Sequence, residues 1–331
     1  MPDIITTGEL LIDFTPVKAP GAENALCPNP GGAPGNVAVQ LARLGVPAGF
    51  IGKVGDDSFG HTLKDCLRDN GVDVQNVVVD ESVHTTLAFV HLDSRGDRSF
   101  TFYRDPGADT QLREEEVDKS ALKDCKIFHF GSLSLTTEPG RTTTLNMVKE
   151  ARAMGKMISY DPNWRPALWK DAEAGIAAMG LGLTLCHILK ISEEELSLLT
   201  GTDSIAEGVR AVHDKGVILT LVTLGPDGCV SSLKGRLSHH PTYDVNVVDT
   251  TGSGDSFWGA FLSQLVQNGY DTPEKLESLG QEELDGFCRF ANAAGSMCAS
   301  KPGGIPALAG REAILQCMEG AEVLETGFRL M

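Results

Sequence analysis

Basic residues and aromatic side chains are scarce in this sequence. Its 331 residues carry 28 Lys+Arg against 45 Asp+Glu, a formal net charge of −17, and only 6% of the residues are aromatic. Phosphate backbones are bound by clustered cations, and single-stranded bases stack on aromatic rings. The composition therefore argues against a nucleic-acid partner, and we expect none.

Paired cysteines and long apolar runs are also missing. The eight cysteines are scattered with no C-x-x-C pair, which argues against a zinc ribbon or a disulfide framework and favours reduced thiols. No stretch approaches the ~18 uninterrupted apolar residues of a membrane span. The first residues carry Asp3, Glu9 and Asp13 and no basic region, unlike a signal peptide. We expect a soluble, cytoplasmic protein with no membrane partner.

Short apolar runs alternate with amphipathic helical patterns along the chain. The runs lie at 4–7, 49–54, 127–130, 157–160, 188–191 and 218–223, and the helical patterns at 36–44, 59–70, 141–154 and 205–213. Such alternation predicts an α/β fold, with a parallel sheet between two helical layers. Ligands of these folds gather at the carboxyl ends of the strands. After residue 255 the pattern is mostly helical, most clearly at 256–267 and 282–300.

One region departs from this alternation. Residues 86–92 and 98–104 read as two strands joined by a turn that contains Gly96. Together with residues 10–14 they predict a small second sheet. Because no Pro/Ser-rich linker divides the chain, we expect this sheet to be a lid inserted in a single domain, 1–331. The lid should span roughly 9–35 and 84–106.

The segment Gly252-Ser253-Gly254-Asp255 carries the strongest chemical signal. It follows a strand and leads into a helix, which we expect to begin at or near Asp255. Glycines let a ligand approach the backbone, and the free amides of a helix N-terminus attract an anion such as a phosphoryl group. Asp255 is then placed to take a proton from an attacking hydroxyl, and the helix end should keep it ionised. The structural alternative is a simple N-cap. No Lys follows the glycines, so this is not a Walker A loop.

Polar residues at other turns and strand ends are weaker candidates. Gly32 and Asn36 belong to a glycine-rich turn before a helix, Asp13 lies in an alternating strand, and Arg165 follows a strand. Asn36 offers a donor and an acceptor, Asp13 can accept from sugar hydroxyls, and Arg165 offers several donors. A tight turn and an exposed edge-strand acid are the structural alternatives for Gly32–Asn36 and Asp13.

Three further strand ends point toward a nucleotide and a metal. Lys190 ends a strand and can approach a phosphate, and Gly225 and Gly228 can form a shelf for a nucleotide or a simple turn. Glu195 can hold a water of Mg²⁺, an ion that retains its waters. The alternative for Glu195 is a capping box with Ser192, three residues earlier.

Taken in this order, the motifs resemble the ribokinase-like (PfkB) carbohydrate kinase family over almost the whole chain. The segment from Gly31 to Gly45 is similar to the N-terminal signature of that family, and the segment from Asp249 to Phe257 to its highly specific C-terminal signature. Residues 50–57, 160–169 and 190–201 are most similar to the fructokinase branch. The resemblance implies a Rossmann-like α/β/α sandwich with a β-sheet lid, often used for dimerisation.

The resemblance also implies roles for individual residues. Asp255 would be the catalytic base, and the amides of Gly252, Ser253, Gly254 and Asp255 would form an anion hole. The remaining roles are sugar binding by Asp13, Gly32, Asn36, Arg165 and either Phe102 or Arg104; nucleotide binding by Lys190, Thr223, Gly225, Gly228 and Asn292; Mg²⁺ through Glu195; and K⁺ near Asp249, Thr251, Ala299 and Gly304.

The expected reaction is transfer of a phosphoryl group from Mg-ATP to a primary hydroxyl of a sugar, with D-fructose as the first choice. Aminoimidazole riboside, ribose and 2-keto-3-deoxygluconate are alternative acceptors, and Pro106–Asp109 is also seen in riboside kinases. A non-catalytic sugar or nucleotide sensor is a further alternative. Ser192 replaces the usual Asn of the family, and Trp258 stands where a smaller residue is usual.

Overall fold

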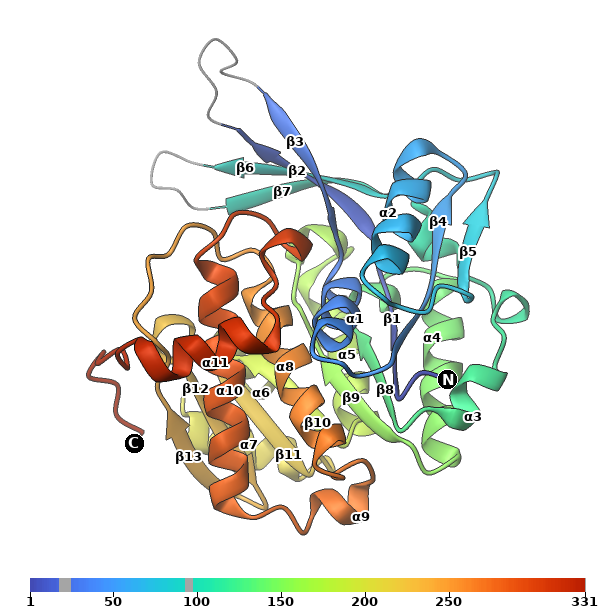
Figure 1. The fold of residues 1–331 in the computed structure, drawn as a ribbon. Helices are drawn as coiled ribbons and strands as arrows, with labels where there is room; N and C mark the ends of the chain where they lie inside the picture. The colour runs from blue at the N-terminus through green and yellow to red at the C-terminus, as the bar shows by residue number, and fades with distance from the viewer. Residues whose placement is uncertain (18–24, 93–97, 331) are drawn as a thin grey trace.

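The computed structural model describes residues 1–17, 25–92 and 98–330. Nine of the described strands form one large sheet, and four form a small sheet that projects from it (Figure 1). The large sheet contains, from one edge to the other, β13 (Arg236–His240), β12 (Cys229–Leu233), β11 (Leu219–Thr223), β10 (Ile188–Ser192), β9 (Met157–Asp161), β8 (Ile127–Gly131), β1 (Ile4–Thr7), β4 (Ala48–Gly55) and β5 (Val77–Asp80).

All neighbours in this sheet from β5 to β11 are parallel, and β12 and β13 add an antiparallel edge. The chain builds outward from β1 to β4 and β5 and then returns to place β8 on the other side of β1. Loops diverge where the strand order reverses in this way, which leaves a crevice at the carboxyl ends of the strands. The topology therefore predicts where a ligand binds.

Helices cover both faces of the large sheet. Ile4 and Ile5 of β1 are adjacent and belong to different core clusters, as the two-residue period of a strand requires. The first cluster is covered by α1 (Ala33–Arg43), α2 (Ser58–Asp69), α8 (Ser253–Gln267), α9 (Pro273–Leu276) and α10 (Gln281–Ala299), with α11 (Arg311–Gly320) packed on α10. The second is covered by α3 (Ser120–Asp124), α4 (Gly140–Ala153), α5 (Ala172–Leu185), α6 (Glu193–Thr200) and α7 (Ile205–His213).

The small sheet has the order β3-β2-β6-β7 and stands at the top of the molecule in Figure 1. Its strands are β2 (Leu11–Pro16), β3 (Leu26–Gly31), β6 (Leu87–Leu92) and β7 (Arg98–Tyr103). They come from the two stretches expected to form a lid, so we call this sheet the lid. The turn with Gly96 lies outside the described residues.

The expected α/β architecture with a small second sheet is confirmed, and the helix after the glycine turn begins earlier than expected. Helix α8 begins at Ser253 rather than near Asp255, with Gly252 as N-cap at φ 77°. Asp255 is therefore the third residue of the helix and not its cap. In the part of the chain that the structure describes, no helix is long and apolar enough to cross a membrane.

Candidate active site

Two cavities meet at the start of α8, at the carboxyl ends of the parallel strands. The larger, of about 880 Å³, lies between the lid and the large sheet and reaches Asp255. The smaller, of about 540 Å³, lies beside it and is lined by loops after β11 and by α10. Val247, Thr250 and Gly254 line both cavities. We call them the acceptor cavity and the side cavity.

The turn before α8 presents backbone amides where the cavities meet. Asp249 holds this turn, because its carboxylate accepts hydrogen bonds from the amides of Thr251 (2.8 Å) and Gly303 (3.0 Å). The amide of Ser253 donates to the Thr250 carbonyl at 3.2 Å, so it is not free as we expected. Within the described residues, the amides of Gly254 and Asp255 have no acceptor. They remain available to an anion at the positive end of the helix dipole.

Asp255 is half-buried at the floor of the acceptor cavity. Its Oδ2 accepts a hydrogen bond from Nδ2 of Asn36, 2.7 Å away. Burial raises the pKa of the Asp255 carboxyl, and the nearby Lys190 and the bond from Asn36 oppose that rise without cancelling it. The helix end was expected to keep Asp255 ionised. Instead, loss of solvent has the larger effect and makes this carboxylate more basic than an exposed one.

Lys190 lies on the acceptor side of the junction rather than in the side cavity. Its Nζ is 2.7 Å from Oδ2 of Asp161, the last residue of β9, and both side chains are buried. Burial lowers the pKa of Lys190, but Asp161, Glu195 and Asp255 together outweigh it, so the pKa is raised. A Cβ on Gly254 would lie only 3.2 Å from this ammonium group. A charged cation therefore lies directly beside the free amides.

The walls of the acceptor cavity bring together most residues expected to bind a sugar. Asp13, Gly32, Asn36, Phe102 and Arg165 all line it. Arg165 lies with its guanidinium carbon 5.7 Å from the centre of the Phe100 ring, which also lines the cavity from the lid. The sequence reasoning missed Phe100. The alternation of Phe100 and Phe102 along one strand, which places both on the same face, was the available signal.

Arg104, expected as the alternative to Phe102, does not line the cavity. Its guanidinium donates to Oδ2 of Asp109 at 2.6 and 2.8 Å and also reaches the Leu133 carbonyl at 2.9 Å. Both side chains of this ion pair are buried. Arg104 thus connects the end of β7 to the body of the molecule. Asp109, which makes this ion pair, belongs to the segment Pro106–Asp109 that suggested a riboside kinase.

Glu195 lies at the start of α6 and accepts backbone hydrogen bonds with both oxygens. Ser192 and Glu195 form the capping box that was the structural alternative, with the Ser192 amide 2.9 Å from Oε2. Oε1 of Glu195 accepts a hydrogen bond from the backbone amide of Trp164, 2.6 Å away. No three His, Cys, Asp or Glu side chains of the described ranges are grouped to hold a metal ion directly. A metal that keeps its waters and binds mainly to a ligand's phosphates fits such a site.

The side cavity contains the other residues expected to bind a nucleotide. Thr223, Gly225, Gly228 and Asn292 line it. Nδ2 of the Asn292 side chain donates to the carbonyls of His240 (2.9 Å) and Pro241 (3.1 Å). This side chain therefore helps to form the wall of the side cavity. At φ 85°, Gly228 adopts a conformation that other residues avoid, and a Cβ there would collide with the His240 carbonyl.

The residues expected near a monovalent cation lie in two adjoining loops. The amides of Val248 and Asp249 donate to the Ala299 carbonyl at 2.8 and 3.1 Å, and Asp249 also holds Gly303. Thr251 and Gly304 lie in the same two segments, and a Cβ on Gly252 would be 3.2 Å from Cα of Gly304. The Ala299 carbonyl and the Asp249 carboxylate therefore hold the two loops together behind the anion-binding turn. Such oxygen ligands suit a hard cation.

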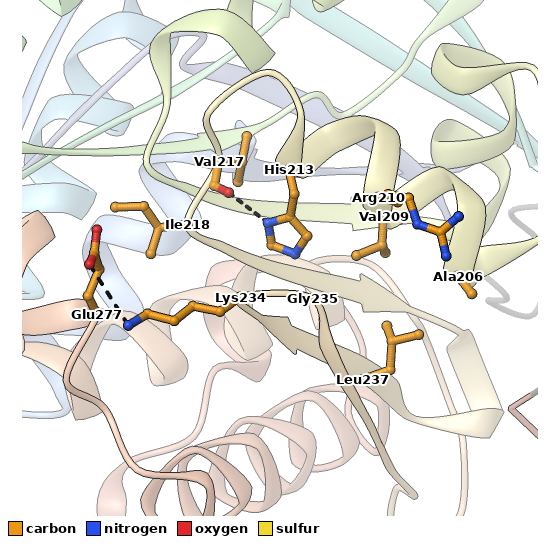
Figure 2. Close-up of a pocket in the computed structure, with 10 residues that line it drawn as sticks. All are labelled: Ala206, Val209, Arg210, His213, Val217, Ile218, Lys234, Gly235, Leu237 and Glu277. Atoms are coloured by element: carbon orange, nitrogen blue, oxygen red, sulfur yellow. Dashed lines mark hydrogen bonds and ion pairs between the residues drawn. The ribbon is translucent and has the colours of Figure 1, made fainter.

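A third cavity, of about 460 Å³, shares no described lining residue with the other two (Figure 2 shows its lining). It is formed by α7, the residues just before β11 and the β12–β13 turn, at the opposite end of the parallel strands. His213 makes hydrogen bonds to the Val217 carbonyl (2.7 Å) and to Ser232 (2.8 Å), and Lys234 lies 3.8 Å from Glu277. Because these polar groups are already paired, this cavity is not our candidate site.

Trp258 does not distort the anion-binding turn. It is fully buried on α8, where its indole N–H donates to Ser159 Oγ at 3.0 Å and its ring stacks on Phe261. The large side chain fills the core between α8 and the sheet.

Comparisons with known proteins agree with this geometry. Residues 1–309 match the sequence model of the pfkB family of carbohydrate kinases. The chain is similar to Fructokinase-1 of Oryza sativa subsp. japonica, with 43% identity over 323 residues that cover 96% of this chain and 98% of the relative.

Solved structures give the same result. A fructokinase with bound ATP from Xylella fastidiosa has a TM-score of 0.88 and 33% identity, covering 96% of this chain and 99% of that one. A fructokinase from Vibrio cholerae O395 with fructose, ADP and calcium has a TM-score of 0.86 and 32% identity, with the same coverage. These similarities confirm the ribokinase-like fold expected from the motifs. The chain belongs to the pfkB family of carbohydrate kinases.

Proposed function

We propose that this protein is an ATP-dependent fructokinase that converts D-fructose to fructose 6-phosphate. The observation that carries the proposal is the junction of the two cavities at Gly254 and Asp255. A nucleotide in the side cavity and a sugar in the acceptor cavity would meet at two free amides, a buried ammonium and a basic carboxylate. The fructokinase relatives, similar over nearly the whole chain, favour fructose as the acceptor.

The proposed mechanism uses these groups directly. Asp255 takes the proton from the primary hydroxyl of the sugar as its oxygen forms a bond to the γ-phosphorus. The bond from that phosphorus to the bridging oxygen breaks, and ADP leaves with the electron pair. The amides of Gly254 and Asp255 and the ammonium of Lys190 stabilise the charge on the transferred group. Asn36 keeps the carboxylate of Asp255 oriented through their 2.7 Å hydrogen bond.

Two ions belong to the proposal. Mg²⁺ would bind the phosphates of ATP and neutralise their charge, and Glu195 would act on it only through water. K⁺ would bind near Asp249, Thr251, Ala299 and Gly304, in the two adjoining loops behind the turn. We further propose that the enzyme is cytoplasmic, forms a homodimer through the lid and needs neither nucleic acid nor membrane.

The test is ADP release with Mg-ATP and K⁺ on fructose, ribose, glucose, 2-keto-3-deoxygluconate and aminoimidazole riboside. We expect turnover on fructose, and a loss of at least ~100-fold in Asp255→Asn, the scale for removing a general base. Asp214→Asn, at an exposed carboxylate just after α7, is the matched control and should retain activity. Turnover on the riboside alone would overturn the substrate assignment, and ATP binding without turnover on any sugar would indicate a sensor.

A further inference from the structure

Asn163 has an unusual backbone conformation. Within the described ranges, only Asn163 (φ 49°) and Lys234 (φ 54°) are non-glycine residues with positive φ. This left-handed region is unfavourable for residues with a Cβ, although Asn tolerates it better than most. Strained conformations persist where neighbouring structure holds them and are frequent at functional sites. Lys234 lies in the β12–β13 turn, where positive φ is ordinary, whereas Asn163 follows β9 at the active site.

Hydrogen bonds on both sides hold Asn163 in this conformation. The carbonyl of Pro162 accepts bonds from the amide and the hydroxyl of Ser132. The amide of Trp164 donates to Oε1 of Glu195 at 2.6 Å. The Trp164 ring also stacks on Trp169, with 6.0 Å between centroids. The chain is therefore fixed immediately before and immediately after Asn163.

This conformation places Asn163 on the wall of the acceptor cavity, which is also lined by Arg165, Lys190 and Asp255. The Asn163 side chain has no hydrogen-bond partner among the described residues, although its position is fixed. The other amide on this wall, Asn36, donates to Asp255 through Nδ2, which leaves its Oδ1 without a partner among the described residues. Because Asn163 is partly exposed and lines this cavity, its amide is accessible to a ligand there.

We infer that Asn163 binds hydroxyl groups of the acceptor sugar and helps to select it, an inference that rests on the function proposed above. The carbonyl oxygen of an amide accepts and its NH₂ group donates, so one Asn side chain can bind two adjacent hydroxyls. Arg165 can only donate and the carboxylate of Asp13 can only accept. The left-handed backbone, held by the bonds to Glu195 and Ser132, keeps Asn163 on the cavity wall.

The test is Asn163→Gly, because glycine adopts φ 49° freely and removes only the amide. We expect the dissociation constant for fructose, measured by titration calorimetry without ATP, to rise about tenfold, and KM for fructose to rise with it. The melting temperature should change by less than about 2 °C, since the backbone is not disturbed. Asn163→Asp keeps a residue that tolerates this φ but loses the donor, so it should also bind fructose more weakly.

Lys234→Gly is the matched control, because it relieves the other positive φ far from the site. It should leave fructose binding and kinetics unchanged. Fructose binding within twofold of wild type in Asn163→Gly would overturn the inference, and so would a fall in kcat with unchanged fructose binding, which would assign the amide to the phosphoryl group. Failure of the wild-type protein to bind or phosphorylate fructose would instead contradict the proposed function.

Discussion

At the scale of single residues, Asp255 and Lys190 control each other's ionisation. Burial raises the pKa of Asp255, and Lys190 is the strongest group that opposes the rise. The base is lost as pH falls through this pKa, so activity should fall at a higher pH than for an exposed aspartate. Lys190→Met removes the opposing charge and should shift the acid limb of the kcat profile to still higher pH.

A pH series of kcat at saturating sugar measures this shift. Lys234→Met, which removes a distant exposed ammonium, should leave the limb where it is in the wild-type enzyme. Lys190→Met should also lower kcat at every pH, because the transferred phosphoryl group loses the ammonium that stabilises its charge. The pH at which the acid limb falls does not depend on that lower kcat. An unchanged limb would mean that Lys190 does not act on the base.

Glu9 is a second residue whose protonation the fold alters. Its carboxyl is 2% exposed, and only one oxygen has a partner, the amide of Ala33 at 3.0 Å. Burial raises the pKa of Glu9 to about 7, against the effect of Arg104. The protonated form therefore stabilises the fold below pH ~4.5, and this contribution is lost as pH rises to about 7.

Glu9→Gln should remove that pH dependence. Relative to the variant, the wild-type protein should lose up to about 3 kcal/mol of unfolding free energy between pH 4.5 and pH 8, following a shift of the pKa from 4.5 to about 7. Urea unfolding of both proteins at several pH values measures the difference. The exposed Glu81→Gln is the control, and parallel pH curves for wild type and Glu9→Gln would contradict the argument.

At the scale of elements, one buried ion pair attaches the lid to the body. Arg104, directly after β7, binds Asp109 and also donates to Thr136 at 2.9 Å, while Asp109 accepts from Thr86 before β6. Arg104→Met should reduce the unfolding free energy by about 3–5 kcal/mol, because it leaves the Asp109 carboxylate buried without its cation.

Urea unfolding checks the size of this loss. The double variant Arg104→Met/Asp109→Leu should recover part of it, since replacing both charges removes the unpaired carboxylate. Arg68→Met, which breaks the exposed Arg68–Asp65 pair, is the control and should cost less than about 1 kcal/mol. Equal losses in the single and double variants would argue against a role for the ion pair itself.

The elements also show how far sequence reasoning reaches. Buried parallel strands give continuous apolar runs, so β1 was predicted at its observed ends, and β8, β9 and β10 were each predicted one residue short. Strand β3 was missed because Pro28 and Pro30 break the usual pattern, which an edge strand tolerates. Helix α5 was missed because its glycines and near-uniform apolar character give little amphipathic contrast.

The site residues divide in the same way. Gly252, Gly254 and Asp255 could be proposed from sequence because their residue types and spacing indicate an anion-binding turn without reference to distant partners. The roles of Arg104 and Glu195 depend on partners elsewhere in the chain, Asp109 and the Trp164 amide, which side-chain type does not indicate. The conformation of Asn163 is likewise imposed by distant hydrogen bonds. Local chemistry is therefore readable from sequence, and pairing across the fold is not.

At the scale of the whole molecule, the lid leaves apolar side chains in solvent. Leu26 on β3 is 41% exposed and Tyr103 on β7 is 65% exposed, at the two edge strands of the small sheet. Unpaired strand edges with apolar side chains favour association with another sheet. These observations support the proposed dimer through the lid and give it a direct test.

The double variant Leu26→Asp/Tyr103→Asp should convert a dimer to a monomer in sedimentation velocity at micromolar protein concentration. Both side chains are exposed in one chain, so the substitutions should change the stability of the monomer little, whereas burying two carboxylates at an interface is costly. Leu181→Asp is the control, since Leu181 on α5 is equally exposed, at 41%, but lies away from the lid. A wild-type protein that sediments as a monomer would contradict the proposed dimer, and dissociation by Leu181→Asp would place the interface on the helical face instead.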